Sequence, residues 1–143
     1  MHVKTFADTN VHVYAHSSSK DPKDIEKRNT ALQMLDECYL VISTQVIREF
    51  TSVMIGNKGK QSIDETEIHV ENMIDIAESV IEEDLELIRT AFKIHKEYIY
   101  GFYDSLIISA ALRGNCDVLL SEDMQHEQMI EERLTIINPF FKC

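Results

Sequence analysis

A chain of 143 residues, 44% of them hydrophobic, has about the size of one domain with a single core, so we expect one domain over 1–143. Its 14 Lys and Arg against 25 Asp and Glu give a net charge of −11, the wrong sign for a protein that wraps nucleic acid by bulk charge. The N-terminus lacks the pattern of a secretory signal, and no run reaches the roughly 18 apolar residues of a membrane span, so we expect a cytoplasmic protein without a membrane partner.

The first third of the chain alternates short apolar segments with helical patterns. We expect a strand over 3–8 (VKTFAD), a short helix from about Thr9, a helix over 21–37 and a strand over 39–43 (YLVIS). Asp21 and Pro22 form the pattern of a helix N-cap followed by the first helical residue. Thr44 is the expected cap of the next helix, over 45–56 (QVIREFTSVMIG), which carries Glu49.

The middle of the chain shows the 3.6-residue period of two amphipathic helices, expected over 62–79 and 82–98. The acidic segment, residues 64–86, holds ten carboxylates and no Lys or Arg, which leaves the rest of the chain near −1. The ten are Asp64, Glu65, Glu67, Glu71, Asp75, Glu78, Glu82, Glu83, Asp84 and Glu86. Two interpretations stay open: a solvated outer surface, or a docking surface for a basic partner.

The last third contains the most apolar helical pattern, over 103–115, with Asp104 at its N-terminal end. Strands are expected over 116–121 (CDVLLS) and 133–139 (RLTIINP), separated by a polar loop over 122–132 with at most one helical turn. Short strands alternating with helices predict an α/β fold: a three-layer α/β/α sandwich with a short, mostly parallel central sheet. Three widely spaced cysteines and no CxxC pair indicate neither a disulfide framework nor a zinc site.

Four acids stand where such a fold gathers ligands. Asp8 and Asp123 each follow an apolar strand, and α/β sheets bind ligands at the carboxyl ends of their strands. Glu49 lies within an apolar helical stretch, and Asp104 stands at the head of the most apolar helix. Carboxylates brought together in a low dielectric repel one another, so a cluster of four is expected to hold a cation or to take up protons. Oxygen donors alone favour Mg²⁺ or Mn²⁺ over zinc.

Each of these acids also has an ordinary structural explanation. Asp8 and Asp104 could each cap the helix that follows. Glu49 could be a surface residue paired with Arg48 or with a lysine. Asp123 could belong to a turn formed with its neighbours in the polar loop. The functional interpretation depends on all four acids occurring together on one βα framework.

Five segments resemble a known family in the same order and at similar spacings: FADTN (6–10), VIREF (46–50), YDSLIISAAL (103–112), LLSEDMQHEQ (119–128) and INPF (137–140). Together they resemble the PIN domain over the whole chain, and are most similar to VapC-type toxins of bacterial toxin-antitoxin pairs. The resemblance implies that Asp8, Glu49, Asp104 and Asp123 are catalytic residues and ligands of Mg²⁺ or Mn²⁺. It also implies that Asn10 and Ser121 support the metal and the substrate phosphate.

A few features concern the mouth of such a site. Glu127 stands where relatives often have Gly, which bears on the shape of that loop and on substrate access. Basic residues are few there, and Arg48 and Lys58 are the candidates for binding substrate phosphate. Lys58 lies near Lys60 in a loop whose lysines could equally serve only solubility.

The function implied by the resemblance is that of a metal-dependent endoribonuclease, which hydrolyses RNA phosphodiester bonds without a covalent enzyme intermediate. The implied partners are RNA, a small antitoxin protein and a second copy of the chain in a homodimer. Two alternatives stay open: a PIN-like nuclease outside toxin-antitoxin systems that acts on DNA or in RNA maturation, and a non-catalytic PIN-fold binding protein. His12 and His126 could carry protons, although a His in such a position is more often structural.

Overall fold

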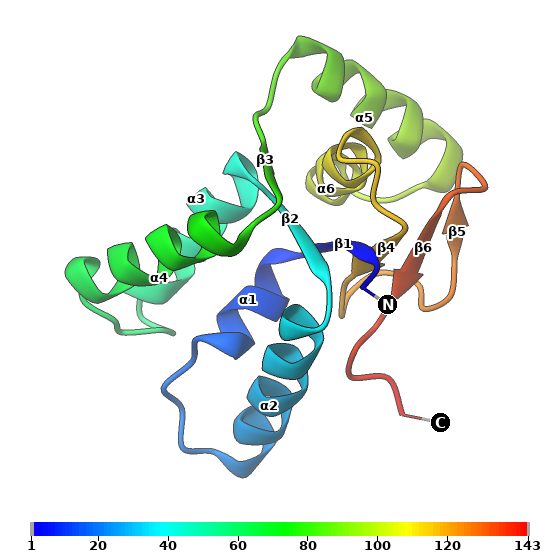
Figure 1. Cartoon of the computed structure of the whole chain (residues 1–143). Helices are drawn as coiled ribbons and strands as arrows, with labels where there is room; N and C mark the ends of the chain where they lie inside the picture. Colours follow the sequence, from blue (N-terminus) through cyan, green and yellow to red (C-terminus); the bar gives the residue numbers. More distant parts are fainter. Residues whose placement is uncertain (1, 143) are drawn as a thin grey trace.

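The computed structural model describes residues 2–142, which form three layers of helices and strands (Figure 1). The strands are β1 (Lys4–Ala7), β2 (Tyr39–Ser43), β3 (Ser79–Ile81), β4 (Val118–Leu120), β5 (Met129–Ile130) and β6 (Leu134–Ile137). The helices are α1 (Thr9–Ala15), α2 (Pro22–Asp36), α3 (Thr44–Ile55), α4 (Ile63–Ile76), α5 (Leu85–Tyr98) and α6 (Phe102–Arg113). The three-layer α/β/α architecture predicted from the sequence is confirmed.

The central sheet has the strand order β3-β2-β1-β4-β6-β5, and all neighbours are parallel except β5 and β6. In Figure 1, α5 and α6 lie on one side of the sheet and α1 and α2 on the other, with α3 and α4 packed as a pair beside α1. Strands β2 and β3, which follow β1 in the chain, lie on one side of β1 in the sheet. The later strands β4 and β6 lie on its other side. The carboxyl ends of β1 and β4 therefore form a switch point, where open α/β sheets bind ligands.

The core lies on both faces of this sheet, which explains why the strands are apolar rather than alternating. Phe6, Ile42, Leu119 and Ile136, from four neighbouring strands, are fully buried. Every residue of the α6 run 105–111 is buried as well, because α5 covers the outer side of that helix. No helix within residues 2–142 has both the length and the apolar character needed to cross a membrane.

The helix caps follow the sequence closely. Asp21 accepts a hydrogen bond from the Lys23 backbone N–H at 2.9 Å, and Pro22 is the first residue of α2, as predicted. The cap of α3 differs from the expectation by one residue, because Ser43, at the end of β2, accepts the bond from the Val46 N–H at 3.2 Å. Either hydroxyl suits the role, and the end of the strand decides between them.

Two short strands were not predicted. The helix expected over 62–79 ends at Ile76, and Ser79–Ile81 form edge strand β3 parallel to β2. The predicted polar loop over 122–132 contains β5, which pairs antiparallel with β6, and its residues form no helix. Strands of two or three residues are too short to show a period, so pairing with a neighbouring strand creates them.

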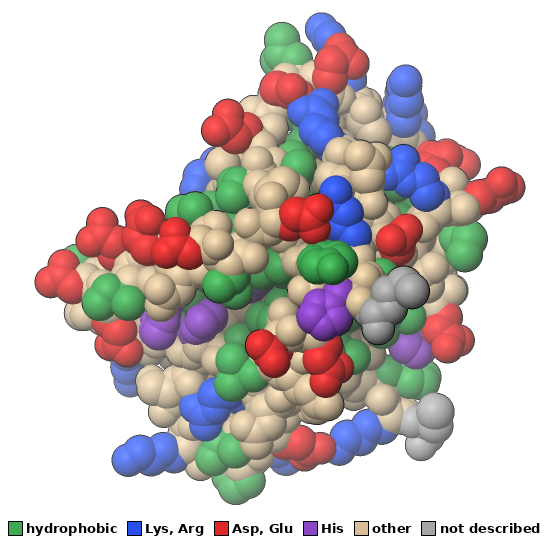
Figure 2. Space-filling view, viewed as in Figure 1, with side chains coloured by type: hydrophobic (Ala, Val, Ile, Leu, Met, Phe, Trp, Pro, Cys, Tyr) green, Lys and Arg blue, Asp and Glu red, His purple; other side chains and the backbone are tan. Residues whose placement is uncertain are grey.

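The acidic segment divides into paired and exposed carboxylates. Four of the ten form ion pairs with Lys or Arg: Glu78 with Lys4 (3.9 Å), Glu83 with Arg48 (3.8 Å), Asp84 with Arg113 (2.7 Å) and Glu86 with Arg89 (2.5 Å). Five of the other six lie on α4 and are exposed. Figure 2 shows acidic side chains gathered over the arm of the molecule that α4 forms. The interpretation as a solvated outer surface therefore fits α4, whereas the later part of the segment is locally neutralised.

Candidate active site

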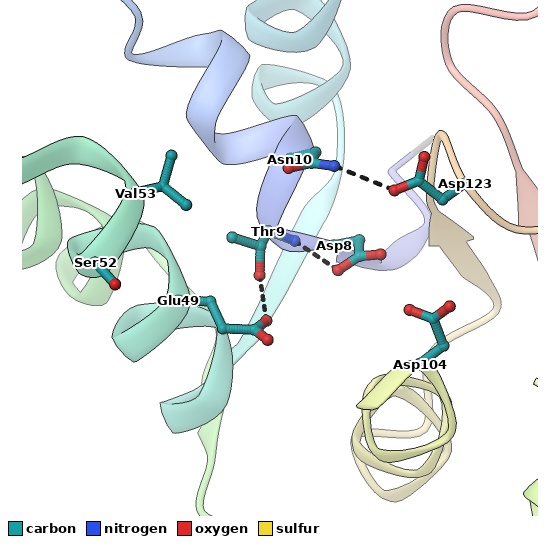
Figure 3. A pocket seen from close by; sticks show the side chains of 8 residues that line it. All are labelled: Asp8, Thr9, Asn10, Glu49, Ser52, Val53, Asp104 and Asp123. Atoms are coloured by element: carbon teal, nitrogen blue, oxygen red, sulfur yellow. Dashed lines mark hydrogen bonds between the residues drawn. The ribbon is translucent and has the colours of Figure 1, made fainter. Parts of the chain in front are cut away.

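The four predicted acids line one cavity of about 350 Å³ at the carboxyl ends of β1 and β4 (Figure 3). We call it the acidic cavity; its lining consists of Asp8, Thr9, Asn10, Glu49, Ser52, Val53, Asp104 and Asp123. The acids come from four separate places: the end of β1, the middle of α3, the first turn of α6 and the loop after β4. In Figure 3 the carboxyl groups of Asp8, Asp104 and Asp123 point toward a common space.

Asp8 connects the sheet to the cavity. Its backbone N–H donates to Leu120 O at 2.9 Å, which places it directly beside the end of β4. Its carboxylate caps α1 by accepting from the Thr9 N–H at 2.7 Å, and it also accepts from Ser121 Oγ at 3.2 Å. The capping explanation is therefore correct, and the same carboxylate still lines the cavity. Burial, reinforced by the charge of Asp104, raises the pKa of Asp8 to about 6 despite these hydrogen bonds.

Asp104 is not a helix cap, which corrects the structural alternative for this residue. Helix α6 begins at Phe102 with Gly101 as its N-cap, so Asp104 lies inside the first turn. Burial and then the charges of Asp123 and Glu49 raise the pKa of Asp104. Its carboxylate has no capping role in the helix, and it is surrounded by like charge.

Glu49 is held by a neighbour that the sequence did not single out. Thr9 Oγ1 donates to Glu49 Oε1 at 2.7 Å, and Gln45 Nε2 lies 3.5 Å from the other carboxylate oxygen. The alternative that Glu49 pairs with Arg48 is wrong, because Arg48 Nη2 lies 3.8 Å from Glu83 Oε1. Arg48 does not line the acidic cavity, so the structure gives no support to its predicted contact with substrate.

Asp123 lies on the exposed rim, where Asn10 Nδ2 donates to its Oδ2 at 3.2 Å. The preceding residue, Glu122, is fixed from behind by Lys27 Nζ at 2.5 Å and by the Tyr14 hydroxyl at 3.2 Å. This anchor positions the loop that carries Asp123. Lys27 was missed by the sequence analysis, since nothing in the α2 pattern distinguishes it from other surface lysines.

The predicted polar partners fall into two groups. Asn10 and Ser121 each hold one of the predicted acids by the hydrogen bonds described above. Lys58 does not line the acidic cavity; it lines a second hollow that adjoins it. Ser52 was missed and lines the acidic cavity one helical turn after Glu49, a spacing from which it could have been found.

The two histidines considered as proton carriers lie elsewhere. His12 is fully buried, and burial lowers its pKa to about 3. His126 Nδ1 accepts from the Asn138 backbone N–H at 3.0 Å, and its ring stacks on Phe141 with centroids 4.1 Å apart. Neither residue lines the acidic cavity, so a role in proton transfer has no structural support.

Glu127 adopts the backbone shape that a glycine would have at this position. Its φ is 66°, in the left-handed region, and its N–H donates to Ile136 O at 2.7 Å. A side chain costs roughly 1 kcal/mol in that region, so the loop keeps its path at some expense in strain. The side chain itself is 76% exposed and does not line the acidic cavity.

The donor set fits a hard divalent cation. Among residues 2–142, no three His, Cys, Asp or Glu side chains stand ready to coordinate one ion. Mg²⁺ does not need such a cage, because it keeps several waters and takes one or two carboxylates together with substrate phosphate. The acids of this cavity repel one another, and the pKa values of Asp8 and Asp104 are raised. A cation that enters the cavity relieves this repulsion and is therefore bound favourably.

Comparisons with known proteins agree with the fold described above. A family model described as PIN domain matches residues 5–131. The fold is similar to a toxin-antitoxin complex from Klebsiella pneumoniae, with a TM-score of 0.66 and 17% identity over 95% of this chain and 98% of that chain. It is also similar to VapBC2 from Rickettsia felis, bound to a DNA fragment from its promoter, with a TM-score of 0.62 and 18% identity over 94% of this chain and 99% of that chain.

A third similar structure is Mycobacterium tuberculosis VapC20, described as a Sarcin-Ricin loop cleaving toxin. The TM-score is 0.60, with 14% identity over 83% of this chain and 91% of that chain. No curated protein matches the sequence. The resemblance carried by the five sequence segments is thereby confirmed at the level of family and fold.

Proposed function

The chain belongs to the PIN domain family, and from that premise we propose that it is a Mg²⁺- or Mn²⁺-dependent endoribonuclease, a VapC-like toxin. Membership of the family supports a nuclease. The observation that carries the proposal is the convergence of Asp8, Glu49, Asp104 and Asp123 on one cavity at the switch point of the sheet. When bound, a divalent ion supplies Lewis-acid stabilisation of charge on the phosphodiester oxygens.

The chain's own residues would divide the work as follows. Asp8 and Asp104 hold the cation, since their carboxylates are the ones whose pKa is raised by burial and like charge. Thr9 orients Glu49, and Asn10 orients Asp123, by the hydrogen bonds seen in Figure 3. Water is the proposed nucleophile, so the carboxylates also serve to orient it and to accept its proton.

RNA is the proposed substrate, and a small antitoxin and a second copy of the chain are the proposed protein partners. VapC20, which shares the fold, is described as cleaving the Sarcin-Ricin loop, and two of the similar structures are toxin-antitoxin assemblies. These similarities support the substrate and the antitoxin by analogy. A PIN nuclease that acts on DNA or in RNA maturation is the alternative that the experiment below has to separate.

The test compares RNA and single-stranded DNA of the same sequence with purified wild type in Mg²⁺, in Mn²⁺ and in excess chelator. We expect cleavage of RNA with either ion, none in chelator, and little of DNA. Asp104→Asn serves as the control for a contaminating nuclease and should be inactive in every condition. Cleavage that survives chelator in wild type, or that persists in Asp104→Asn, would refute the proposal, and efficient cleavage of DNA would favour the alternative.

A further inference from the structure

A second cavity of about 790 Å³ opens from the rim of the acidic cavity. The two share Asn10, Val53 and Asp123 in their linings, so they are neighbouring parts of one surface depression. The second cavity extends along α1 to the serine run 17–19 and to the loop 58–60 after α3. Its volume lies within the roughly 300–1,000 Å³ that is usual for ligand sites. The role of the acidic cavity does not account for it.

Two unpaired lysines distinguish the second cavity from the first. Lys58 and Lys60 line it, and within residues 2–142 neither lysine forms an ion pair with a carboxylate. The other charged residues in its lining are acidic and already have partners: Asp24 accepts from Ser19 Oγ at 2.7 Å, Asp123 accepts from Asn10 Nδ2 at 3.2 Å, and Glu122 is neutralised by its ion pair with Lys27. Within residues 2–142, the positive charge of the two lysines is therefore not neutralised by an ion pair, although acidic side chains line the same cavity.

The loop that carries these lysines is held in a fixed shape. A Cβ on Gly59 would lie 2.5 Å from Met54 Cα, so only glycine permits this close approach. Lys60 has a φ of 54°, and its N–H donates to Gly56 O at 2.8 Å. Gln61 Nε2 donates to the His16 carbonyl at 3.0 Å, which ties the loop to the end of α1. A lysine kept in the left-handed region at a cost in strain suggests that its position matters.

The serine run 17–19 in the same lining offers hydroxyl groups on an equally fixed backbone. The Arg28 guanidinium donates to the carbonyls of Ser17 and Ser19, which clamps the serine run onto α2. Ser17 Oγ accepts from the Ser19 N–H at 3.1 Å and keeps its own proton to donate. Ser18 is exposed and also lines the second cavity. Lysine ammonium groups and serine hydroxyls in one lining are the usual chemistry for contacts with a nucleic-acid backbone.

We propose that the second cavity is a subsite for the RNA strand, which accommodates the nucleotide next to the scissile bond while Lys58 and Lys60 bind the flanking phosphate. The inference rests on the proposed nuclease function and deepens it. A polyanion at the acidic cavity meets carboxylates whose charge a bound cation offsets only locally, so cations a short distance along the strand would add to its affinity. The two lysines are the unpaired cations that line either cavity among the described residues.

The first experiment measures cleavage of a short RNA with one cleavage site by Lys58→Ala/Lys60→Gly. Glycine suits the left-handed backbone at position 60, so charge is removed without added strain. We expect KM to rise roughly tenfold, kcat to stay within about twofold, and the slope of log affinity against log salt to fall by about one per lysine. Lys93→Ala/Lys96→Ala removes the same charge from α5, outside both cavities, and should change none of these.

The second experiment locates the contact. A methylphosphonate, which has no charge, replaces each flanking phosphate of the RNA in turn, and binding is measured by fluorescence anisotropy with the inactive Asp104→Asn background. We expect one position at which the methylphosphonate lowers the affinity of the Asp104→Asn protein for RNA. The same replacement should not lower the affinity of the variant that carries Asp104→Asn and also lacks both lysines. Equal losses for both proteins at every position would overturn the proposal, as would a double-lysine variant that binds RNA normally and loses only a protein partner.

The anisotropy measurement does not require cleavage, so the two proposals fail separately. If wild type does not cleave the RNA but one methylphosphonate position still lowers affinity only when the lysines are present, the subsite stands and the nuclease assignment fails. If wild type cleaves and no phosphate couples to the lysines, the nuclease stands and the subsite fails.

Discussion

The acidic cavity and the outer surface of α4 are both rich in carboxylates, yet they place them in different surroundings. On α4 the acids are exposed, and they spread over the arm of the molecule seen in Figure 2. In the cavity Asp8 and Asp104 are partly buried beside Glu49, and the pKa of each of the two aspartates is raised. Residue type alone does not separate the two regions. The two regions differ in burial. Exposed carboxylates are surrounded by water, which screens their mutual repulsion, whereas buried carboxylates lose this solvation and repel one another strongly.

The largest difference between the regions should appear in activity. Asp8→Asn or Asp104→Asn is expected to lower kcat/KM by at least about 100-fold, because each removes a negative ligand from the proposed cation site. Glu71→Gln on α4 is the matched control and should alter the rate by less than about twofold. Single-turnover cleavage with purified proteins measures both. Equal effects of the substitutions at the two regions would show that the acids of the cavity are no more important for activity than those of α4.

A second difference should appear in the pH dependence of stability without metal. The folded pKa of Asp8, about 6, lies above its ordinary value of 3.8, so this group stabilises the fold below pH 3.8 and the contribution is lost as pH rises through 6. The free energy of unfolding should fall across that window by up to about 3 kcal/mol for this one residue.

Urea titrations at a series of pH values in chelator would measure this fall. Asp8→Asn should flatten the profile and should be at least as stable as wild type at pH 7, since Asn caps a helix as well as Asp does. Glu71→Gln should leave the profile unchanged. A wild-type profile that rises between pH 4 and 6.5 and is unaffected by Asp8→Asn would show that burial and like charge do not raise the pKa of Asp8 in the folded protein.

The smallest expected effect belongs to α4 itself. Replacing its exposed acids in Glu67→Gln/Glu71→Gln/Asp75→Asn should tighten nonspecific RNA binding by roughly twofold to fivefold at low salt, and hardly at all at physiological salt. Filter binding at two ionic strengths measures this. Loss of cleavage on a saturating substrate, with the fold unchanged, would instead place α4 in the active site.

The sequence predicted the site best where one rule of geometry governed it. Asp8 and Asp123 follow strands, and parallel strands bring their carboxyl ends to one edge, so their meeting could be foreseen. For Arg48 the sequence offers no such rule, and the structure places this residue outside the lining of the acidic cavity. Neighbouring residues on a helix point about 100° apart, so Arg48 cannot share the direction of Glu49. The sequence places the two side by side, and only the orientation of α3 decides which of them enters the cavity.

Other parts of the molecule could not be foreseen because long-range packing creates them. Strand β3 exists through its pairing with β2, since three residues show no period of their own. The second cavity is formed by the serine run, the end of α3 and the loop 58–60, which no sequence pattern connects. Glu127 is an intermediate case, because its comparison with Gly pointed to an unusual loop, and its left-handed φ agrees.

The helix-capping bond of Asp8 has a consequence for how such a protein can change over generations. One carboxylate both starts α1 and faces the cavity, so most replacements would harm folding and activity together. Asn is the exception, because it retains the cap while removing the charge. A lineage that no longer benefits from cleavage therefore has a short mutational path to a well-folded, inactive descendant. Such a descendant would keep the shape of this surface and could still bind what its ancestor cut.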